Sequence, residues 1–258
     1  MLARRVILKG FAAAPLAGAS LAAVLASPDL ARAAANRLTR HSARLKSGKS
    51  VHAYLAMPAR TPAPAIVTIH EWWGLNDQIK AVTAEFANQG YLSLAIDLMS
   101  DAVATTRDGA RAQMQAVDSA EADETAAHWV KWLRGHDKSS GKIGTVGWCF
   151  GGGWSLNASI VAPVDATVIY YGQVTRPAQE LARLKGPVLG HFATQDKWID
   201  ATMVDGFEAA MKQAGKSVTS HWYEANHAFA NPTSARYDAG DAKQAWTRTL
   251  DFFRANLG

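Results

Sequence analysis

Short runs rich in apolar and β-branched residues alternate along the chain with longer amphipathic segments. Such runs predict strands, and the continuously apolar ones are typical of strands buried on both faces of a parallel sheet. The predicted strands cover residues 51–57, 65–70, 91–96, 142–146, 166–171, 187–192 and 218–223. Apolar positions at helical spacing predict helices over residues 76–88, 108–134 (in two pieces), 152–158 and 234–255.

This alternation predicts a single α/β domain over residues 36–258, with a doubly wound, mostly parallel sheet and helices on both faces. Residues 36–50 are polar and basic, which predicts either a mobile arm or a first strand. Residues 97–107 predict a loop, and no linker divides the domain.

The first 35 residues differ from the rest of the chain. A pair of arginines, Arg4 and Arg5, precedes an apolar Ala/Leu-rich run over residues 10–26, and small residues follow at 31–35. This order is typical of a twin-arginine-type signal peptide, so we expect cleavage near Ala35 and a periplasmic or secreted protein. A retained membrane anchor is the alternative, but the run is short for a membrane span.

The charge of the chain gives no indication of nucleic-acid binding. The formal net charge is +5, and the leader residues Arg4, Arg5, Lys9 and Arg32, set against Asp29, account for +3 of it. No cluster of basic residues with interleaved aromatics follows. We therefore expect a monomer that acts on a small molecule, with no nucleic-acid partner and no stable membrane span after signal removal.

The single cysteine, Cys149, lies between a predicted strand and a predicted helix, flanked by Gly147 and Gly151. A nucleophile at the apex of a sharp strand-to-helix turn is the layout of a nucleophile elbow. A thiol at a helix N-terminus is also favoured as thiolate. The alternative is a buried structural cysteine in a glycine-rich turn; in either case an intrachain disulfide is excluded.

Two further residues follow strand ends, where the catalytic groups of parallel sheets gather. Asp196 follows the strand ending at residue 192, and His227 follows the strand ending at residue 223. A thiolate can attack, an imidazole can transfer the proton and a carboxylate can fix its tautomer, so the pattern predicts a Cys149–His227–Asp196 triad. Taken singly, Asp196 could be a helix cap and His227 a loop histidine.

The segment His70-Glu71-Trp72-Trp73-Gly74-Leu75-Asn76 follows the strand ending at residue 69. In α/β-hydrolases a loop at this position supplies one N–H of the oxyanion hole, which predicts that role for the backbone N–H groups of Trp72 and Phe150. The motifs H-E-x-x-G-x-N and G-x-C-x-G-G, with the later Asp and His loops, resemble those of the dienelactone hydrolase (carboxymethylenebutenolidase) family.

The resemblance implies an α/β-hydrolase fold and a cysteine hydrolase that cleaves a lactone or ester through an acyl-enzyme. In that family the glutamate of the H-E motif pairs with the resting thiol and helps to deprotonate it, which implies this role for Glu71 beside Cys149. No cofactor is implied. We expect no metal site, because His128 and His136 are too far apart for a helical ligand pair.

The same resemblance leaves the substrate open. Family members bind a substrate carboxylate with two arginines; Arg107 or Arg111 could supply one, but Asn231 stands where the other is expected. Asn231 cannot form a charged fork, and Trp73 and Trp198 suggest an aromatic pocket that suits a neutral ester. A broad carboxylesterase or thioesterase, or a non-catalytic thiol sensor on the same fold, are the alternatives.

Overall fold

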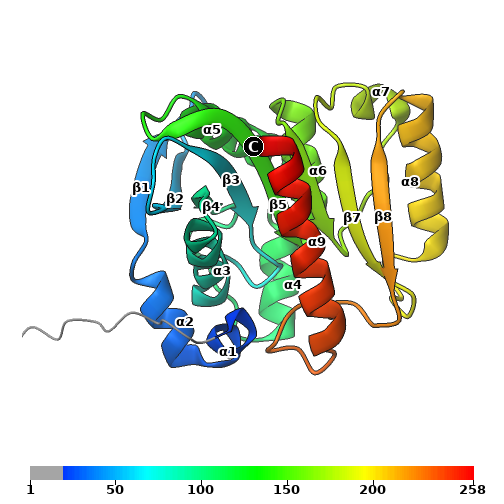
Figure 1. Ribbon diagram of the computed structural model, residues 1–258, viewed down its shortest axis with the longest axis horizontal. Helices are drawn as coiled ribbons and strands as arrows, with labels where there is room; N and C mark the ends of the chain where they lie inside the picture. Colours follow the sequence, from blue (N-terminus) through cyan, green and yellow to red (C-terminus); the bar gives the residue numbers. More distant parts are fainter. Residues whose placement is uncertain (1–19) are drawn as a thin grey trace, which may run out of the picture.

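The computed structural model describes residues 20–258, in which one eight-stranded sheet has the order β1-β2-β4-β3-β5-β6-β7-β8 (Figure 1). β1 and β2 are antiparallel, β2 and β4 are antiparallel, and all other neighbours are parallel. The strands are β1 (Thr39–Arg44), β2 (Ser50–Ala56), β3 (Ala63–Ile69), β4 (Leu92–Ile96), β5 (Ser139–Trp148), β6 (Ala166–Tyr170), β7 (Val188–Ala193) and β8 (Val218–Tyr223). The predicted mostly parallel sheet is confirmed.

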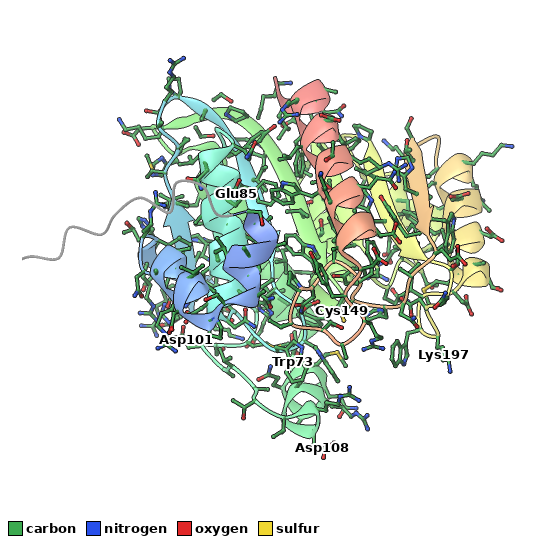
Figure 2. All side chains as sticks on the ribbon, turned by 60° about the horizontal axis from the view of Figure 1, so that its bottom comes forward. Trp73, Glu85, Asp101, Asp108, Cys149 and Lys197 are labelled. Carbon is green, nitrogen blue, oxygen red and sulfur yellow. The ribbon has the colours of Figure 1, made fainter. Side chains whose placement is uncertain are left out.

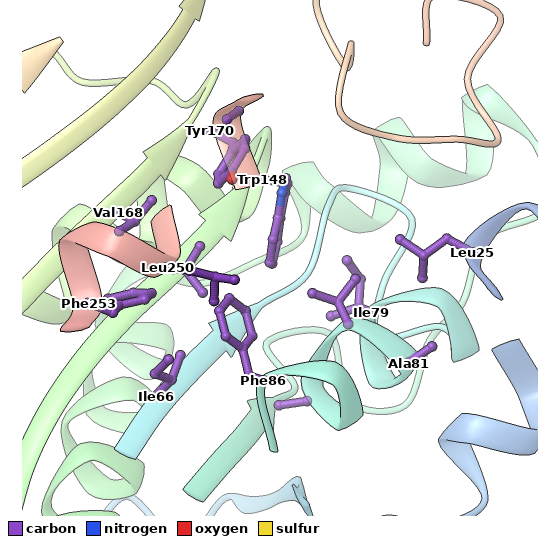
Figure 3. Packing of buried hydrophobic residues seen from close by; sticks show 14 of the residues in the cluster. Leu25, Ile66, Ile79, Ala81, Phe86, Trp148, Val168, Tyr170, Leu250 and Phe253 are labelled. Atoms are coloured by element: carbon purple, nitrogen blue, oxygen red, sulfur yellow. The ribbon is translucent and has the colours of Figure 1, made fainter. Parts of the chain in front are cut away.

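Helices cover both faces of the sheet. On one face, α3 (Asp77–Asn88) and α9 (Ala239–Leu257) bury Phe86 and Phe253 against each other and against Ile66 of the sheet (Figure 3). The other face is covered by α5 (Ser119–Arg134), α6 (Phe150–Val161) and α8 (Ala201–Gln213). Short helices complete the chain: α1 (Leu21–Ala26), α2 (Pro28–Ala35), α4 (Arg107–Gln115) and α7 (Ala178–Leu181).

The parallel strands end in register at one edge of the sheet. Ile69 of β3 is level with Gly147 of β5, Trp148 is level with Tyr170 of β6, and Ala193 of β7 is level with Tyr223 of β8. Loops that follow these strands therefore meet at the same edge. This is where ligands bind in doubly wound sheets.

The structure answers the question left open for residues 36–50, and it places the start of the last helix later than expected. Residues 39–44 form β1, so the first-strand interpretation of segment 36–50 is confirmed over that range. The last helix begins at Ala239 rather than near Ser234, because the Asp238 side chain accepts a hydrogen bond from the N–H of Asp241 (2.9 Å) and caps it there.

The C-terminal part of the predicted leader is folded onto the domain. α1 and α2 pack against α3, and Val24, Leu25 and Ala31 are buried in the same core as Ile79. The arginine pair Arg4 and Arg5 lies outside the described residues, and cleavage near Ala35 stays a prediction. None of the helices described within residues 20–258 is both long and apolar enough to cross a bilayer.

Candidate active site

Cys149 occupies a strained turn between β5 and α6. Its φ of 54° and ψ of −116° are unusual for a non-glycine residue and turn the chain sharply from strand to helix. Gly147 and Gly151 make the turn possible: a Cβ on Gly147 would lie 1.9 Å from the Gly151 carbonyl oxygen, and one on Gly151 would lie 2.3 Å from the Ile69 oxygen. The backbone thus presents a half-buried thiol at the carboxyl edge of the sheet (Figure 2).

Asp196 and His227 are brought together at this edge. The His227 Nδ1 lies 2.6 Å from Asp196 Oδ2, and the other carboxylate oxygen, Oδ1, accepts the N–H groups of Trp198 (2.9 Å) and Ile199 (3.2 Å). These bonds fix the carboxylate, which in turn fixes the orientation of the imidazole. Although burial alone would raise the pKa of Asp196, its hydrogen bond to His227 and the nearby imidazole charge lower it.

His227 links the carboxylate to the thiol. Burial alone would lower its pKa, but hydrogen bonds to Asp196 and to the Cys149 sulfur, with the charges of both groups, raise the pKa to about 10. The ordinary value is 6.5. The arrangement therefore favours the charged imidazolium form of His227.

The loop after β3 is fixed by His70. The N–H of Leu98 donates to His70 Nε2 (3.1 Å), so Nδ1 carries the proton and donates to the Glu71 carbonyl oxygen (2.7 Å). Burial lowers the pKa of His70, consistent with this neutral tautomer. His70 also stacks on Phe150 with ring centroids 5.8 Å apart, which joins this loop to the start of α6.

The two predicted oxyanion-hole residues lie on these two adjoining segments. Phe150 begins α6, and N–H groups in the first turn of a helix have no intrahelical acceptor. Trp72 has its carbonyl oxygen bound by the side-chain amide of Gln113 (2.6 Å), which ties the loop to α4. The Phe150 N–H thus directly follows Cys149 in the chain, and the Trp72 N–H belongs to the loop whose His70 stacks on Phe150.

Glu71 is buried and is held by an amide. Asn231 Nδ2 donates to Glu71 Oε2 (2.6 Å), and Asn231 Oδ1 accepts in turn from Gln78 Nε2 (2.8 Å). Burial raises the pKa of Glu71, and the bond from Asn231 and the charges of His227 and Arg236 offset only part of that rise. Asn231 is thus committed to Glu71 through one side-chain atom and to Gln78 through the other.

The model of the dienelactone hydrolase family matches residues 51–257. The chain belongs to this family. Carboxymethylenebutenolidase from Pseudomonas putida is 30% identical over a 220-residue alignment that covers 80% of this chain and 91% of the relative. A Bradyrhizobium sp relative named as a probable 2-oxo-3-(5-oxofuran-2-ylidene)propanoate lactonase is 30% identical over a 229-residue alignment that covers 82% of this chain and 92% of the relative.

Solved structures share the fold. A dienelactone hydrolase-like promiscuous phosphotriesterase from metagenomic libraries has a TM-score of 0.78 at 21% identity, covering 86% of this chain and 100% of that chain. The predicted α/β-hydrolase fold is confirmed. Membership of the dienelactone hydrolase family makes the protein a hydrolase of carboxylic ester bonds, the class to which lactones belong.

The residues predicted to contact substrate do not lie at equal distances from Cys149 and His227. Trp198 is 60% exposed and packs edge-on to His227 (ring centroids 5.2 Å apart), so it lies at the rim of the site. Trp73 packs edge-on against Trp72. Arg107 and Arg111 are exposed on α4, and within residues 20–258 no hydrogen bond joins either one to Glu71, Cys149 or His227.

Tyr171 is a site residue that the sequence reasoning missed. It follows β6 with a φ of 37°, and its ring lies 5.1 Å from that of His227. Its hydroxyl is buried and has no hydrogen-bond partner among the residues that the structure describes. The available clue was its position, since it is the last residue of the predicted strand 166–171, the next strand along the chain after the elbow.

The described part of the chain shows no cluster of three or more His, Cys, Asp or Glu side chains that could hold a metal ion. The chemical groups that the site does offer are a thiol, an imidazole and two carboxyl groups, at Cys149, His227, Asp196 and Glu71.

Proposed function

We propose that this family member cleaves a lactone or ester through a thioester acyl-enzyme on Cys149. The observation that carries the proposal is the pairing of His227 with Asp196 (2.6 Å), together with Cys149, which lies at a strained strand-to-helix turn close enough to raise the pKa of His227. A nucleophile, a proton carrier and an orienting carboxylate in this order are the minimum set for nucleophilic acyl transfer.

In the first half-reaction, the Cys149 thiolate attacks the carbonyl carbon and forms a C–S bond, while the carbonyl π electrons move to oxygen. The backbone N–H groups of Trp72 and Phe150 stabilise that oxyanion. When the intermediate collapses, the C–O bond breaks and the leaving oxygen takes the proton of the His227 imidazolium. The acyl group remains as a thioester.

In the second half-reaction, neutral His227 accepts a proton from water as the water oxygen attacks the thioester. Collapse breaks the C–S bond, releases the carboxylic acid and restores the thiolate–imidazolium pair. Asp196 stays ionised throughout and holds the ring. For a lactone, the acid and the hydroxyl or enol product remain one molecule.

We further propose that the part of the substrate that lies next to Glu71 carries no charge. Asn231 stands where the resemblance places a carboxylate-binding arginine, and its amide is already bound to Glu71. A substrate carboxylate at this point would lie beside a buried carboxyl group without a guanidinium partner.

A substrate panel on Cys149→Ala and the wild-type protein tests the proposal. Wild type should hydrolyse chromogenic esters and neutral lactones, and Cys149→Ala should lose at least about 10⁴-fold in kcat while remaining folded. Efficient turnover of a carboxylated dienelactone alone would contradict the neutral-substrate proposal. If wild type hydrolysed no ester or thioester while its thiol oxidised reversibly, the protein would be a thiol sensor instead.

A further inference from the structure

A pocket lies beside Glu71, and one residue of its wall comes from a segment that the family model does not match. The pocket is lined by Glu71 and Asn231, by Trp148 and Tyr171, and by Leu25 of α1. The family match begins at residue 51, so Leu25 belongs to an N-terminal addition.

This pocket adjoins the reacting groups. Trp148 immediately precedes Cys149, and the ring of Tyr171 lies 5.1 Å from that of His227. Glu71 is close enough to His227 for the imidazolium charge to act on its pKa. Leu25 therefore helps to enclose a space that lies beside these groups.

Leu25 is held firmly in place. Its side chain is 7% exposed and points from α1 toward Ile79 of α3 (Figure 3). Behind it, α2 begins with Ser27 as its cap (Ser27 Oγ accepts the N–H of Leu30, 3.4 Å). Arg32 of α2 pairs with Asp77 at the start of α3 (3.6 Å). Both short helices are thus anchored to the helix that forms the pocket floor.

The chemistry of the pocket defines what fits. Apolar side chains of Leu25, Ile79 and Trp148 face it. Its polar members Glu71, Asn231 and Gln78 are joined by hydrogen bonds, with Asn231 in the middle. An anionic group would lose its hydration there without gaining a partner of opposite charge. A compact, apolar, uncharged group loses little and gains burial.

We propose that Leu25 is a specificity-determining residue that limits the size of the substrate group entering this pocket. The inference rests on the proposed hydrolase function and deepens it: the preferred substrates carry a small, neutral, apolar group on the side of Glu71. The N-terminal addition is then part of the binding site as well as part of the core.

The test uses the full-length protein, with its intact mass measured so that residues 20–35 are known to be retained. Leu25→Ala, Leu25→Phe and wild type are compared on two series of esters, one with acyl groups of increasing length and one with alcohols of increasing length. Leu21→Ala is the matched control, because Leu21 lies on the same helix and packs against the same core. It does not line the pocket.

In at least one series, Leu25→Ala should raise the kcat/KM ratio of large to small substrates by about tenfold, the usual effect of one or two methylene groups in an apolar pocket. Leu25→Phe should lower the same ratio, and Leu21→Ala should leave it unchanged. Equal ratios for all four proteins in both series would overturn the proposal. If Leu25→Ala fails to fold, Leu25→Val and Leu25→Phe still provide one smaller and one larger side chain than leucine for the comparison.

Absence of hydrolysis by wild type would instead contradict the proposed function.

Discussion

At the scale of single residues, the charge of His227 governs the chemistry. Its pKa is raised to about 10 because Asp196 and Cys149 bind the imidazolium. We predict that an NMR titration of the histidines will show His227 charged at pH 8, and that Asp196→Asn or Cys149→Ala will lower its pKa toward the ordinary value. A His227 resonance that titrates near pH 6.5 in wild type would contradict the thiolate–imidazolium pair.

The same shift predicts a pH-dependent stability. A group whose pKa is higher in the folded than in the unfolded state stabilises the fold fully below its unfolded pKa, and this stabilisation is lost as the pH rises through the folded pKa. The contribution of His227 should therefore fall between pH 6.5 and about 10. Denaturant unfolding of Cys149→Ala, in which no thiol titrates, should show a steeper loss of stability across this range than Cys149→Ala combined with Asp196→Asn.

Asn231 provides a prediction about substrate charge. Replacing it with arginine places a cation beside Glu71, where a substrate carboxylate could form a charge-assisted pair. Asn231→Arg should raise kcat/KM for a carboxylated lactone about tenfold relative to a neutral ester of similar size, since such hydrogen bonds contribute about 1.5–3 kcal/mol. Asn231→Gln keeps the neutral amide and is the control. Equal changes for both substrates would show that position 231 does not select for charge.

Tyr171 carries a buried hydroxyl that has no partner among residues 20–258. An unsatisfied buried hydroxyl costs about 1–3 kcal/mol, and a substrate oxygen could satisfy it. Tyr171→Phe should therefore raise the free energy of unfolding by about 1 kcal/mol and lower kcat/KM. Steady-state kinetics and urea unfolding on the same preparation measure both effects. Lower stability together with unchanged kinetics would show that the hydroxyl serves the fold alone.

At the scale of elements, the elbow depends on glycines. A Cβ on Gly151 would meet the backbone oxygens of Ile69 and His70 at 2.3 and 2.4 Å, so Gly151→Ala must displace α6 from β3. Gly206 of α8 offers the matched control, since a Cβ there meets nothing within 4 Å.

Gly151→Ala should destabilise the protein and reduce activity, whereas Gly206→Ala should stabilise it by about 0.8–1.0 kcal/mol through helix propensity. Thermal unfolding and ester hydrolysis check the pair. Normal activity in Gly151→Ala would mean that the elbow tolerates a wider turn than the structure indicates.

The central elements could be predicted because each apolar run is buried on both faces and each helix shows a clear periodicity. β3, β4, β6 and β7 are of this kind, with nearly every residue buried. The start of α9 could not be placed, because Ser234 and Asp238 are both good caps, and loop contacts around Phe229 select between them.

At the scale of the whole molecule, the positions of Cys149, Asp196 and His227 could be predicted, because parallel topology brings strand ends to one edge. The contacts of Gln78 with Asn231 and of Gln113 with Trp72 could not, because each joins segments far apart in the sequence. Their pairing depends on how helices and loops pack, which no local pattern records.

The packing of the N-terminal segment also could not be predicted from a local pattern. Its Ala/Leu-rich composition predicts a cleaved leader, yet Leu25 and Ala31 are buried against α3. Export by the twin-arginine route with cleavage near Ala35 stays a prediction, and it excludes the role proposed for Leu25, because cleavage there would remove Leu25 from the pocket. N-terminal sequencing of the exported protein decides between the two. A mature chain that retains residues 20–35 would contradict cleavage and would keep Leu25 in the pocket.

The central claim is that Cys149 carries the acyl group during turnover. The most direct test is acid quenching of the enzyme during hydrolysis of an excess of a chromogenic ester, followed by peptide mass spectrometry. The peptide containing Cys149 should gain the mass of the acyl group, and Cys149→Ala should gain none and turn over no ester. Full turnover by Cys149→Ala, with no acyl group found on Cys149 in wild type, would show that Cys149 does not carry the acyl group.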